Sequence, residues 1–497
     1  MIKPKASMMK PFVPLALVLA LSACSLAPRY ERPVAPVDAA WPTGPAYDAN
    51  VAAGATPAVP VAEIGWREFF ADPYLQSLIE SALANNRDLR VAALNIERAR
   101  ALYQIQSAAR LPTINATGDG VRQRTPAALS TSGQARTSQQ VAVGLGFSAF
   151  ELDFFGRVAN LREQALEEFL ATEDARRSSQ ISLVSEVANA YLTLLADRQR
   201  LRLAQDTLAS QRESFKLTQS RFEYGVANDL EVNQARTSVE TARADAARFT
   251  SQIAQDENAL RLLVGNALPA EPSPTQTLRD ARLLAELPAG LPSDLLQYRP
   301  DIQQAEHLLR GANANIGAAR ARFFPSISLT SSVGLASTAL SSLFEGGART
   351  WSFSPQITLP IFDGGAIRAN YEGAVVGRDI YVAQYEQTIQ SAFREVSDAL
   401  AVRGTIGEQL DAQQALTDAA QRTYTLSEAR YRGGIDSYLT SLDSQRALYS
   451  AQQGFITTQL SALTSQVTLY KALGGGLTER RNTAEAAATG AAATPVR

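Results

Sequence analysis

The sequence predicts an α+β membrane protein built from two copies of one unit, each with two short strands and very long helices. Three observations predict this fold class. The same landmarks return after 209 residues, and the stretch from Arg157 to Tyr224 contains neither proline nor glycine. Three segments of about ten residues alternate apolar with polar or small side chains, and a fourth, 113–124, alternates poorly. Such periodicity is the main sequence signal for secondary structure, and a long internal period is the signal for a repeated unit.

The internal repeat is clearest at two glycine-containing segments. Residues 221–226 (RFEYGV) return as residues 430–435 (RYRGGI), an offset of 209 residues. A period this long indicates a duplicated domain and not a solenoid. We therefore expect a first repeat over residues 63–290 and a second over residues 291–474.

Each repeat is expected to contain a helix, two strands, a long helix and a shorter return helix, in that order. In the first repeat we expect a helix over about 72–110, strands over about 113–124 and 139–154, a long helix over about 157–224 and a return helix over about 226–264. In the second repeat we expect a helix over about 300–323, strands over about 326–337 and 350–362, a long helix over about 366–432 and a return helix over about 437–473.

The first long helix is the largest predicted element. Its 68 residues from Arg157 to Tyr224 would extend roughly 100 Å at 1.5 Å per residue. Apolar residues recur along it at every seventh position, which predicts left-handed packing of neighbouring helices; they are Val187, Leu194, Leu201, Leu208, Phe215 and Phe222. Taken alone, this pattern favours a plain soluble coiled coil.

The strand segments argue against a plain coiled coil. In residues 326–335 and 351–361, apolar and polar side chains alternate as they do in transmembrane barrel strands, although a half-buried soluble sheet would give the same alternation. Four strands cannot close a barrel in lipid, because open edges leave backbone groups without hydrogen bonds. Three copies would supply twelve strands, whereas two would give an eight-stranded barrel filled by its own side chains. A conducting pore therefore points to a trimer.

The first residues of the chain resemble a targeting signal. Three lysines and an apolar stretch too short to span a bilayer predict a signal peptide over residues 1–23. Leu21-Ser22-Ala23-Cys24 then resembles the lipobox of bacterial lipoproteins, so Cys24 is expected to carry diacylglycerol and palmitate. Ser25, in place of the aspartate that usually retains lipoproteins at the inner membrane, favours the outer membrane. The alternative is an ordinary secretory signal followed by a chance cysteine.

Both ends of the mature chain are predicted to lie outside the packed structure. Residues 24–62 contain seven prolines among alanines, which favours an extended, lipid-anchored linker. Residues 475–497 are rich in alanine, glycine and threonine, and we expect a disordered tail there.

Composition excludes several classes of function. Without residues 1–23 the chain carries 44 basic and 49 acidic side chains, a net charge of −5, so no basic surface for nucleic acid is expected. Cys24 and His307 are the only cysteine and histidine, which excludes His/Cys metal sites and histidine-based triads. Asp153 and Asp363 lie where strands lead into helices, and helix capping explains them better than catalysis. We therefore expect no enzymatic activity, no metal and no cofactor beyond the lipid on Cys24.

Four motifs follow one another in the second half of the chain: RPDI at 299–302, ARFFPSI at 321–327, LPIFDGG at 359–365 and RYRGG at 430–434. Together with the lipobox they resemble the TolC-like outer-membrane efflux proteins, and most closely the OprM/NodT lipoprotein branch. The resemblance covers nearly the whole mature chain. It implies a homotrimer with a twelve-stranded outer-membrane barrel and a twelve-helix periplasmic α-barrel. It also implies that the protein is the exit channel of a tripartite pump and passively conducts drugs and other small toxic molecules. The other two parts of such a pump are a periplasmic adaptor protein and an inner-membrane transporter, often of the resistance-nodulation-division type.

Two tight helical hairpins are predicted where the long helices end. Gly225 and Gly434 can each adopt the left-handed conformation that ends a helix, and Asn228 and Ser437 can cap the helix that follows. The resemblance implies that these tips dock the adaptor; the residues concerned are Arg221, Gly225, Val226, Asn228, Gly434, Ile435 and Ser437. Without the resemblance, the two segments are simply good turns.

The resemblance also implies a periplasmic gate just after the second hairpin. Leu439 and Asp443 lie four residues apart and so share one helix face. In a trimer, that face would form a leucine ring that resists wetting beside a ring of three carboxylates that binds cations. The counterparts in the first repeat are Leu230 and Gln234, so only the second hairpin brings the acid. Without the resemblance, Asp443 reads as a solvated surface carboxylate.

A polar lock is expected to hold the two hairpins together. Its candidates are Arg430, Tyr431 and Asp436. The rival function is a structural coiled-coil outer-membrane lipoprotein that conducts nothing, and the alternating strands disfavour it.

Overall fold

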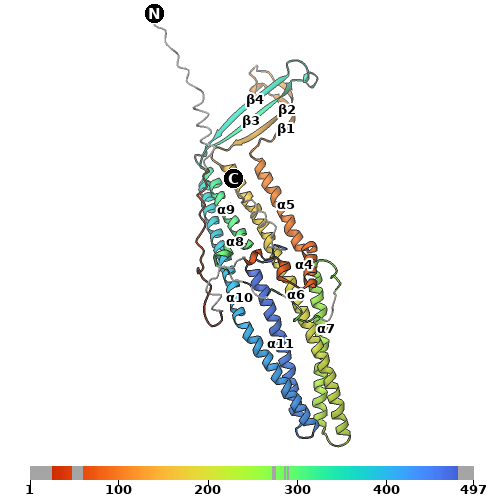
Figure 1. Cartoon of the computed structure of the whole chain (residues 1–497). Helices are drawn as coiled ribbons and strands as arrows, with labels where there is room; N and C mark the ends of the chain where they lie inside the picture. The colour runs from red at the N-terminus through yellow and green to blue at the C-terminus, as the bar shows by residue number, and fades with distance from the viewer. Residues whose placement is uncertain are drawn as a thin grey trace, which may run out of the picture. The chain divides into compact units, whose positions relative to one another are not determined.

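The computed structural model of the chain describes residues 25–47, 60–131, 133–270, 276–281, 283, 284, 287, 290 and 292–479. The predicted signal peptide, Cys24 and most of the predicted tail lie outside the described residues. Both halves of the chain have the same order of elements: helices, two strands, a long helix and a return helix (Figure 1).

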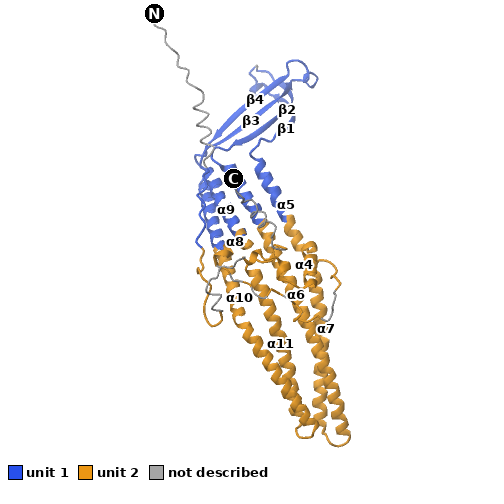
Figure 2. Cartoon of the chain, viewed as in Figure 1, with its two compact units in different colours: residues 1–34, 95–172, 304–385 blue, residues 35–94, 173–303, 386–497 orange. Residues whose placement is uncertain are grey.

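The chain folds into two compact units (Figure 2). Unit 1 comprises residues 1–34, 95–172 and 304–385, and unit 2 comprises residues 35–94, 173–303 and 386–497. Each unit therefore takes segments from both halves of the chain. Unit 1 holds the sheet, and unit 2 holds both helical hairpins.

The long helices lie where the sequence predicts them. They are α6 (Arg157–Glu223) and α10 (Ala366–Arg432), followed by the return helices α7 (Asp229–Val264) and α11 (Tyr438–Ala472). Helix α10 is continuous through the four glycines at 373, 377, 404 and 407. None of the described helices combines the length and the apolar character needed to cross a bilayer.

The single helix predicted over 72–110 is wrong, because the structure has two helices there. These are α4 (Pro73–Asn85) and α5 (Arg87–Ala108), with Asn86 between them. The Asn86 side chain accepts a hydrogen bond from the backbone N–H of Leu89 at 2.9 Å and donates one to the carbonyl of Leu263 at 2.9 Å. An asparagine that caps the next helix in this way ends the preceding one. In the second half, α9 (Pro300–Ala321) is preceded by α8 (Leu295–Tyr298).

Unit 2 is packed around aromatic side chains. The ring of Phe69, from the short helix α3 (Trp66–Phe69), stacks on Tyr470 with 4.0 Å between ring centroids. The Tyr470 hydroxyl donates a hydrogen bond to the carbonyl of Ile64 at 2.7 Å. Other side chains of unit 2 are also fully buried: Phe70, Leu75, Leu78, Ile79, Tyr191, Leu192 and Leu195. Side chains along α6 become less buried toward the hairpin: Val187 is buried, whereas Phe222 is 44% exposed.

The sheet of unit 1 has four antiparallel strands in the order β1-β2-β3-β4. They are β1 (Asn115–Thr125), β2 (Arg136–Leu152), β3 (Ser326–Ser337) and β4 (Arg349–Thr358). Strand β4 ends four residues before the predicted 362. Pro360 follows closely and has no N–H to donate to a ladder, which accounts for the early end.

The register gives the sheet one apolar and one polar face. Partners across the ladders carry the same kind of side chain, as in Leu145–Val333–Trp351 on one face and Ser332–Ser352 on the other. The apolar face carries Val143, Leu145, Phe147, Ile327, Leu329, Val333, Leu335, Trp351, Phe353 and Ile357, and the polar face carries Ser326, Ser328, Thr330, Ser332, Ser352, Ser354, Gln356 and Thr358. Trp351 is 77% exposed and Ile357 is 70% exposed. The apolar face therefore has no cover within the described chain.

Glycines let the strands approach closely on the polar face. A Cβ added to Gly144 would lie 2.9 Å from the carbonyl oxygen of Val333 in the next strand, which real Cβ atoms do not tolerate. A bulge between Phe147 and Phe150 interrupts the same ladder, and Ala149 has a φ of +53° there. Bulges and strand glycines both bend sheets, so β2 and β3 are shaped for a curved sheet.

Residues 25–34, which we call the strap, form neither helix nor strand but are fastened to unit 1. The Ser25 hydroxyl donates a hydrogen bond to Asn160 near the start of α6 at 2.9 Å. Asn313 and Arg320 of α9 donate to the carbonyls of Pro28 and Leu26, at 2.8 and 3.1 Å. The strap is thus bound along its length, which differs from the free linker that the sequence predicts.

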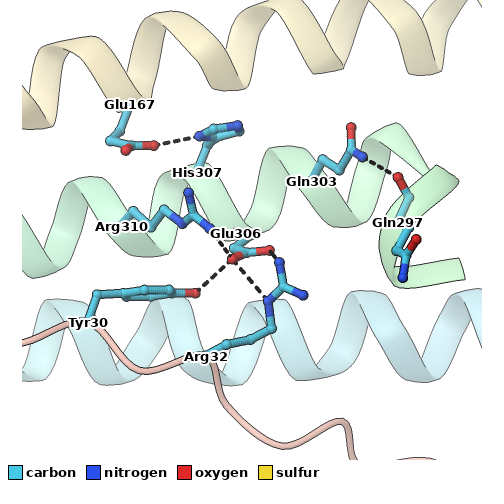
Figure 3. A network of polar contacts seen from close by, with 8 residues as sticks. All are labelled: Tyr30, Arg32, Glu167, Gln297, Gln303, Glu306, His307 and Arg310. Atoms are coloured by element: carbon cyan, nitrogen blue, oxygen red, sulfur yellow. Dashed lines mark hydrogen bonds and ion pairs between the residues drawn. The ribbon is translucent and has the colours of Figure 1, made fainter. Parts of the chain in front are cut away.

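Glu306 of α9 is the centre of the strap's polar contacts (Figure 3). This buried carboxylate accepts hydrogen bonds from Arg32 at 2.7 Å, Arg310 at 2.6 Å and the Tyr30 hydroxyl at 3.2 Å. Burial alone would raise the pKa of Glu306, but the hydrogen bonds from Arg32 and Arg310 outweigh burial and lower it. Burial and the Glu306 charge raise the pKa of Tyr30 to about 12.

Candidate functional site

The two hairpin turns of unit 2 have the same backbone geometry. Gly225 and Gly434 have φ values of +73° and +75°, as predicted for residues that end a helix. In the first turn, the N–H of Val226 donates to the carbonyl of Arg221 at 2.8 Å and the N–H of Gly225 to that of Phe222 at 2.9 Å. Residues 430–435 repeat both bonds, at 2.9 and 3.0 Å. This pattern is the Schellman motif, so both long helices end by the same mechanism.

The two predicted N-caps differ. The Asn228 side chain accepts a hydrogen bond from the N–H of Glu231 at 3.0 Å, which confirms it as the cap of α7. The prediction for Ser437 is wrong, because its side chain makes no capping bond to α11. Its hydroxyl instead lies 3.2 Å from the hydroxyl of Thr440. Serine side chains have alternative local hydrogen-bond partners of this kind, so a suitable residue type does not by itself make a cap.

Two of the three lock candidates form an ion pair within the second hairpin. The guanidinium of Arg430 donates two hydrogen bonds to the carboxylate of Asp436, at 2.6 and 2.9 Å. These bonds raise the pKa of Arg430 and lower the pKa of Asp436. Arg430 is exposed and Asp436 is partly buried. The pair connects the end of α10 to the turn that follows, so it braces one hairpin and does not join the two.

The third candidate, Tyr431, contacts the first hairpin. The guanidinium of Arg221 lies over its ring, with Cζ 4.8 Å from the ring centroid. Tyr431 is 4% exposed and packs in a cluster with Ala235, Tyr438 and Leu442, which Phe215 completes from α6. The buried Tyr431 hydroxyl has no hydrogen-bond partner among the described residues. Of the three lock candidates, Tyr431 is therefore the one that contacts the first hairpin, and it does so through its ring. Farther from the turns, hydrogen bonds from Gln445 to Ser210 at 3.4 Å and from Tyr449 to Asp245 at 3.1 Å also join the two hairpins.

The two gate candidates lie on the exposed side of α11. Leu439 is 47% exposed, and the side chain of Asp443 is 64% exposed. The nearest ionic partner of Asp443 is Arg446, at the long distance of 3.8 Å. Leu442, between them in sequence, is buried in the Tyr431 cluster. The helix thus buries one face inside the chain and leaves the predicted gate face uncovered, as Leu230 is in the first hairpin at 65% exposure.

The two carboxylates predicted to cap helices do so. Asp153 accepts a hydrogen bond from the N–H of Ala159 at 2.7 Å, and Asp363 accepts bonds from the N–H groups of Gly365 and Ile367 at 3.0 and 2.6 Å. These backbone hydrogen bonds lower the pKa of Asp363. Both side chains are therefore used where strands lead into α6 and α10.

A pair of buried carboxylates between α6 and α7 was not predicted. Asp256 is 9% exposed and lies beside Asp197, which accepts a hydrogen bond from Arg200 at 2.6 Å. Gln252 donates to Asp256 at 3.2 Å. Burial, together with the charge of Asp197, raises the pKa of Asp256 to about 6. The two acids lie 59 residues apart in sequence, so only the packing of the hairpin reveals the pair.

Comparison with known proteins identifies the family. The family model described as "Outer membrane efflux protein" matches residues 78–266 and 291–475, which is more than half of the chain. The chain belongs to the outer membrane efflux protein family. It is therefore an outer-membrane efflux channel, which is a transport protein.

Close relatives and solved structures agree with this family. The toluene efflux pump outer membrane protein TtgC of Pseudomonas putida is 53% identical over 464 residues, which cover 93% of this chain and 95% of the relative. The antibiotic efflux pump outer membrane protein ArpC of Pseudomonas putida matches with the same identity and coverage. The open state of the Neisseria gonorrhoeae MtrE outer membrane channel has a TM-score of 0.82 at 37% identity, and covers 93% of this chain and 100% of that one.

Proposed function

We propose that three copies of this outer-membrane efflux protein form one continuous duct, anchored by acyl chains on Cys24, which passively conducts small molecules out of the cell. The duct consists of a twelve-stranded barrel in the membrane and a twelve-helix α-barrel in the periplasm. An inner-membrane transporter, of the resistance-nodulation-division type, supplies the energy and a periplasmic adaptor connects the two.

The observation that carries this proposal is the two-faced, four-stranded sheet. Its register collects apolar side chains on one face, and Leu145, Val333, Trp351, Phe353 and Ile357 among them are exposed in the single chain. Lipid would cover that face, and the serine- and threonine-rich face would line the pore. The edge strands β1 and β4 have unpaired backbone groups, which three copies satisfy by pairing each β4 with the β1 of the next subunit.

The hairpin tips are the docking surface for the adaptor in this proposal. The two Schellman turns present Val226 and Ile435 to solvent, at 66% and 67% exposure. Exposed apolar residues at the end of a rigid hairpin are suited to contact another protein. The docking set is Arg221, Gly225, Val226, Asn228, Gly434, Ile435 and Ser437.

The gate face of α11 closes the duct in this proposal. Threefold symmetry would bring three Leu439 side chains and three Asp443 carboxylates together at the pore mouth. Like charges in a narrow mouth repel one another, and a bound divalent cation relieves the repulsion. The ion pair Arg430–Asp436 braces each second hairpin, and the Tyr431–Arg221 contact holds it against the first.

Small apolar and amphipathic molecules are the proposed cargo. The names of TtgC and ArpC give toluene and antibiotics for those two relatives. The rival function, a non-conducting structural lipoprotein, has no use for a pore-lining polar face.

Single-channel conductance in planar bilayers tests the duct and the gate together. Asp443→Ala should weaken block by millimolar divalent cations and raise conductance, and Leu439→Ala should raise conductance by removing the apolar constriction. Gln234→Ala is the matched control from the first hairpin and should change both quantities less, because a neutral amide adds no charge. Wild-type protein that conducts nothing would favour the structural lipoprotein. Unchanged conductance and block in both gate variants would refute the gate assignment alone.

A further inference from the structure

The charged side chains on the apolar face of the sheet are all arginines. The ladders place Arg122 and Arg124 of β1 and Arg349 of β4 on the same face as Leu145, Val333 and Trp351. The acidic residues of the strands, Asp119 and Glu151, fall on the other face by the same register. Asp119 pairs with Ala142, one step out of phase with the apolar positions, and Glu151 pairs with Ser328.

These three arginines lie at one end of the sheet. Arg122 and Arg124 are in the last four residues of β1, and Arg349 is the first residue of β4. Both positions are at the end where loops join β1 to β2 and β3 to β4, whereas the other end leads into the helices (Figure 1). The apolar positions from Ile327 to Leu335 extend about 27 Å along β3 at about 3.4 Å per residue. The arginines thus follow the apolar band instead of interrupting it.

The three guanidinium groups are exposed and make no ion pair or side-chain hydrogen bond within the described part of the chain. Arg157, at the helix end of the sheet, is by contrast used internally, because its guanidinium donates hydrogen bonds to the carboxylate of Glu151 at 2.5 to 2.8 Å. An arginine on a lipid-facing surface is costly at the middle of a bilayer but costs almost nothing at the level of the head groups. These three arginines are positively charged and would lie at the level of the lipid head groups, so they are suited to bind anionic head groups.

Closure of the barrel would bring these arginines together. Strands β1 and β4 are the two edges of the sheet, and they run in opposite directions. In the proposed trimer, β4 of each subunit pairs with β1 of the next, so the loop end of one lies beside the loop end of the other. Each seam then carries Arg122 and Arg124 from one chain and Arg349 from its neighbour.

We propose that each subunit seam of the trimer is a binding site for the phosphate groups of an outer-leaflet glycolipid, held by Arg122 and Arg124 of one chain and Arg349 of the next. Guanidinium groups bind phosphate through paired, charge-assisted hydrogen bonds, which suits a lipid that carries two phosphates on one head group. The acyl chains of the same lipid would cover the apolar face below the arginines. This inference rests on the proposed trimer, and it assigns the lipid a role in holding the seams together.

Native mass spectrometry of the detergent-purified full chain tests the site with lipid A as the probe. Wild-type trimer should bind up to three molecules, and lipid A stripped of its phosphates should bind more weakly. The triple variant Arg122→Gln/Arg124→Gln/Arg349→Gln should bind intact lipid A at least about tenfold more weakly, which corresponds to the loss of about one charge-assisted hydrogen bond. The control variant Arg212→Gln/Arg236→Gln/Arg422→Gln removes three exposed helix arginines and should bind like wild type.

The outcomes separate this inference from the proposed duct. Equal affinity of wild type and triple variant, or of intact and phosphate-free lipid A, overturns the phosphate site. Dissociation of the triple variant into monomers in lipid-free detergent also overturns it, because the arginines would then hold the subunits directly. Inner-leaflet phospholipids that bind as tightly as lipid A would overturn the assignment to the outer leaflet. Wild-type protein that is monomeric and does not conduct refutes the duct itself.

Discussion

The contact between Tyr431 and Arg221 makes the sharpest prediction about how the two hairpins are held together. Tyr431→Ala removes a buried ring from the cluster with Ala235, Tyr438 and Leu442. Truncation of a buried aromatic side chain costs about 3–5 kcal/mol. Tyr431→Phe removes only a buried hydroxyl that has no partner among the described residues, so it should change stability by less than about 1 kcal/mol. Arg221→Gln should cost about 0.5–1 kcal/mol through the lost cation–π contact.

Two assays measure these effects: single-channel conductance and thermal unfolding of the purified protein. We expect Tyr431→Ala to raise conductance and lower the unfolding temperature, and Tyr431→Phe to behave like wild type. A double-mutant cycle with Arg221→Gln and Tyr431→Leu should show coupling of about 0.5–1 kcal/mol, because leucine keeps the burial but not the ring. Tyr224→Ala is the matched control, since that tyrosine is 85% exposed in the first turn.

Two results would refute this reasoning. If Tyr431→Phe opens the channel as much as Tyr431→Ala does, the hydroxyl makes the lock through a hydrogen bond. If the effects of Arg221→Gln and Tyr431→Leu are additive, the guanidinium and the ring do not stabilise one another.

Three further predictions concern the anchor, the buried acids and the strap. Cys24→Ser should abolish incorporation of radiolabelled palmitate, and persistent label would contradict the lipobox. The pKa of Asp256 is raised, so its contribution to stability is fully present below the unfolded value of 3.8 and is lost as pH rises toward about 6. Asp256→Asn should therefore stabilise the α6–α7 packing by at most about 3 kcal/mol at pH 7 and should not stabilise it at pH 4. Thermal unfolding at the two pH values measures this difference. The pKa of Glu306 is lowered, so the stability it provides is present above the unfolded value of 4.5 and is lost as pH falls below it. Glu306→Gln should accelerate amide hydrogen exchange in residues 25–34 at pH 7. The acceleration should be about tenfold at most, because Arg32 is half-exposed. Unchanged exchange would show that the strap is held by its backbone contacts alone.

Local signals in the sequence predicted the long elements well. The start of α6 at Arg157 and its end at Glu223 follow from a glycine on each side and from the absence of glycine and proline between them. The left-handed glycines at 225 and 434 and the Asn228 cap depend on residues within a few positions, so sequence alone predicted them. Ser437 shows the limit of such signals, because a cap-forming residue type still has a choice of hydrogen-bond partner.

Contacts between distant segments could not be predicted in this way. Arg221 and Tyr431 lie 210 residues apart, and nothing in the sequence near either residue indicates that the Arg221 guanidinium lies over the Tyr431 ring. The strap is a second case, because its proline-rich composition indicates an extended chain but not where that chain binds. Its partners Asn160, Glu306 and Asn313 are more than a hundred residues away and look like ordinary helix positions. The three arginines of the apolar face become a set only when the strand register is known.

The polar face of the sheet has a consequence for what the proposed duct can transport. Its side chains are mostly hydroxyl groups, including Ser326, Ser328, Thr330, Ser352 and Ser354. A hydroxyl donates and accepts hydrogen bonds much as water does, so a passing solute exchanges one set of weak partners for an equivalent set. These hydroxyl groups would hold no solute long enough to slow the next, and the charged residues of this face, Asp119, Arg136 and Glu151, lie on β1 and β2 and not on β3 or β4. The membrane part of the channel would then discriminate little between molecules, and the choice of cargo would be made by the pump that loads it.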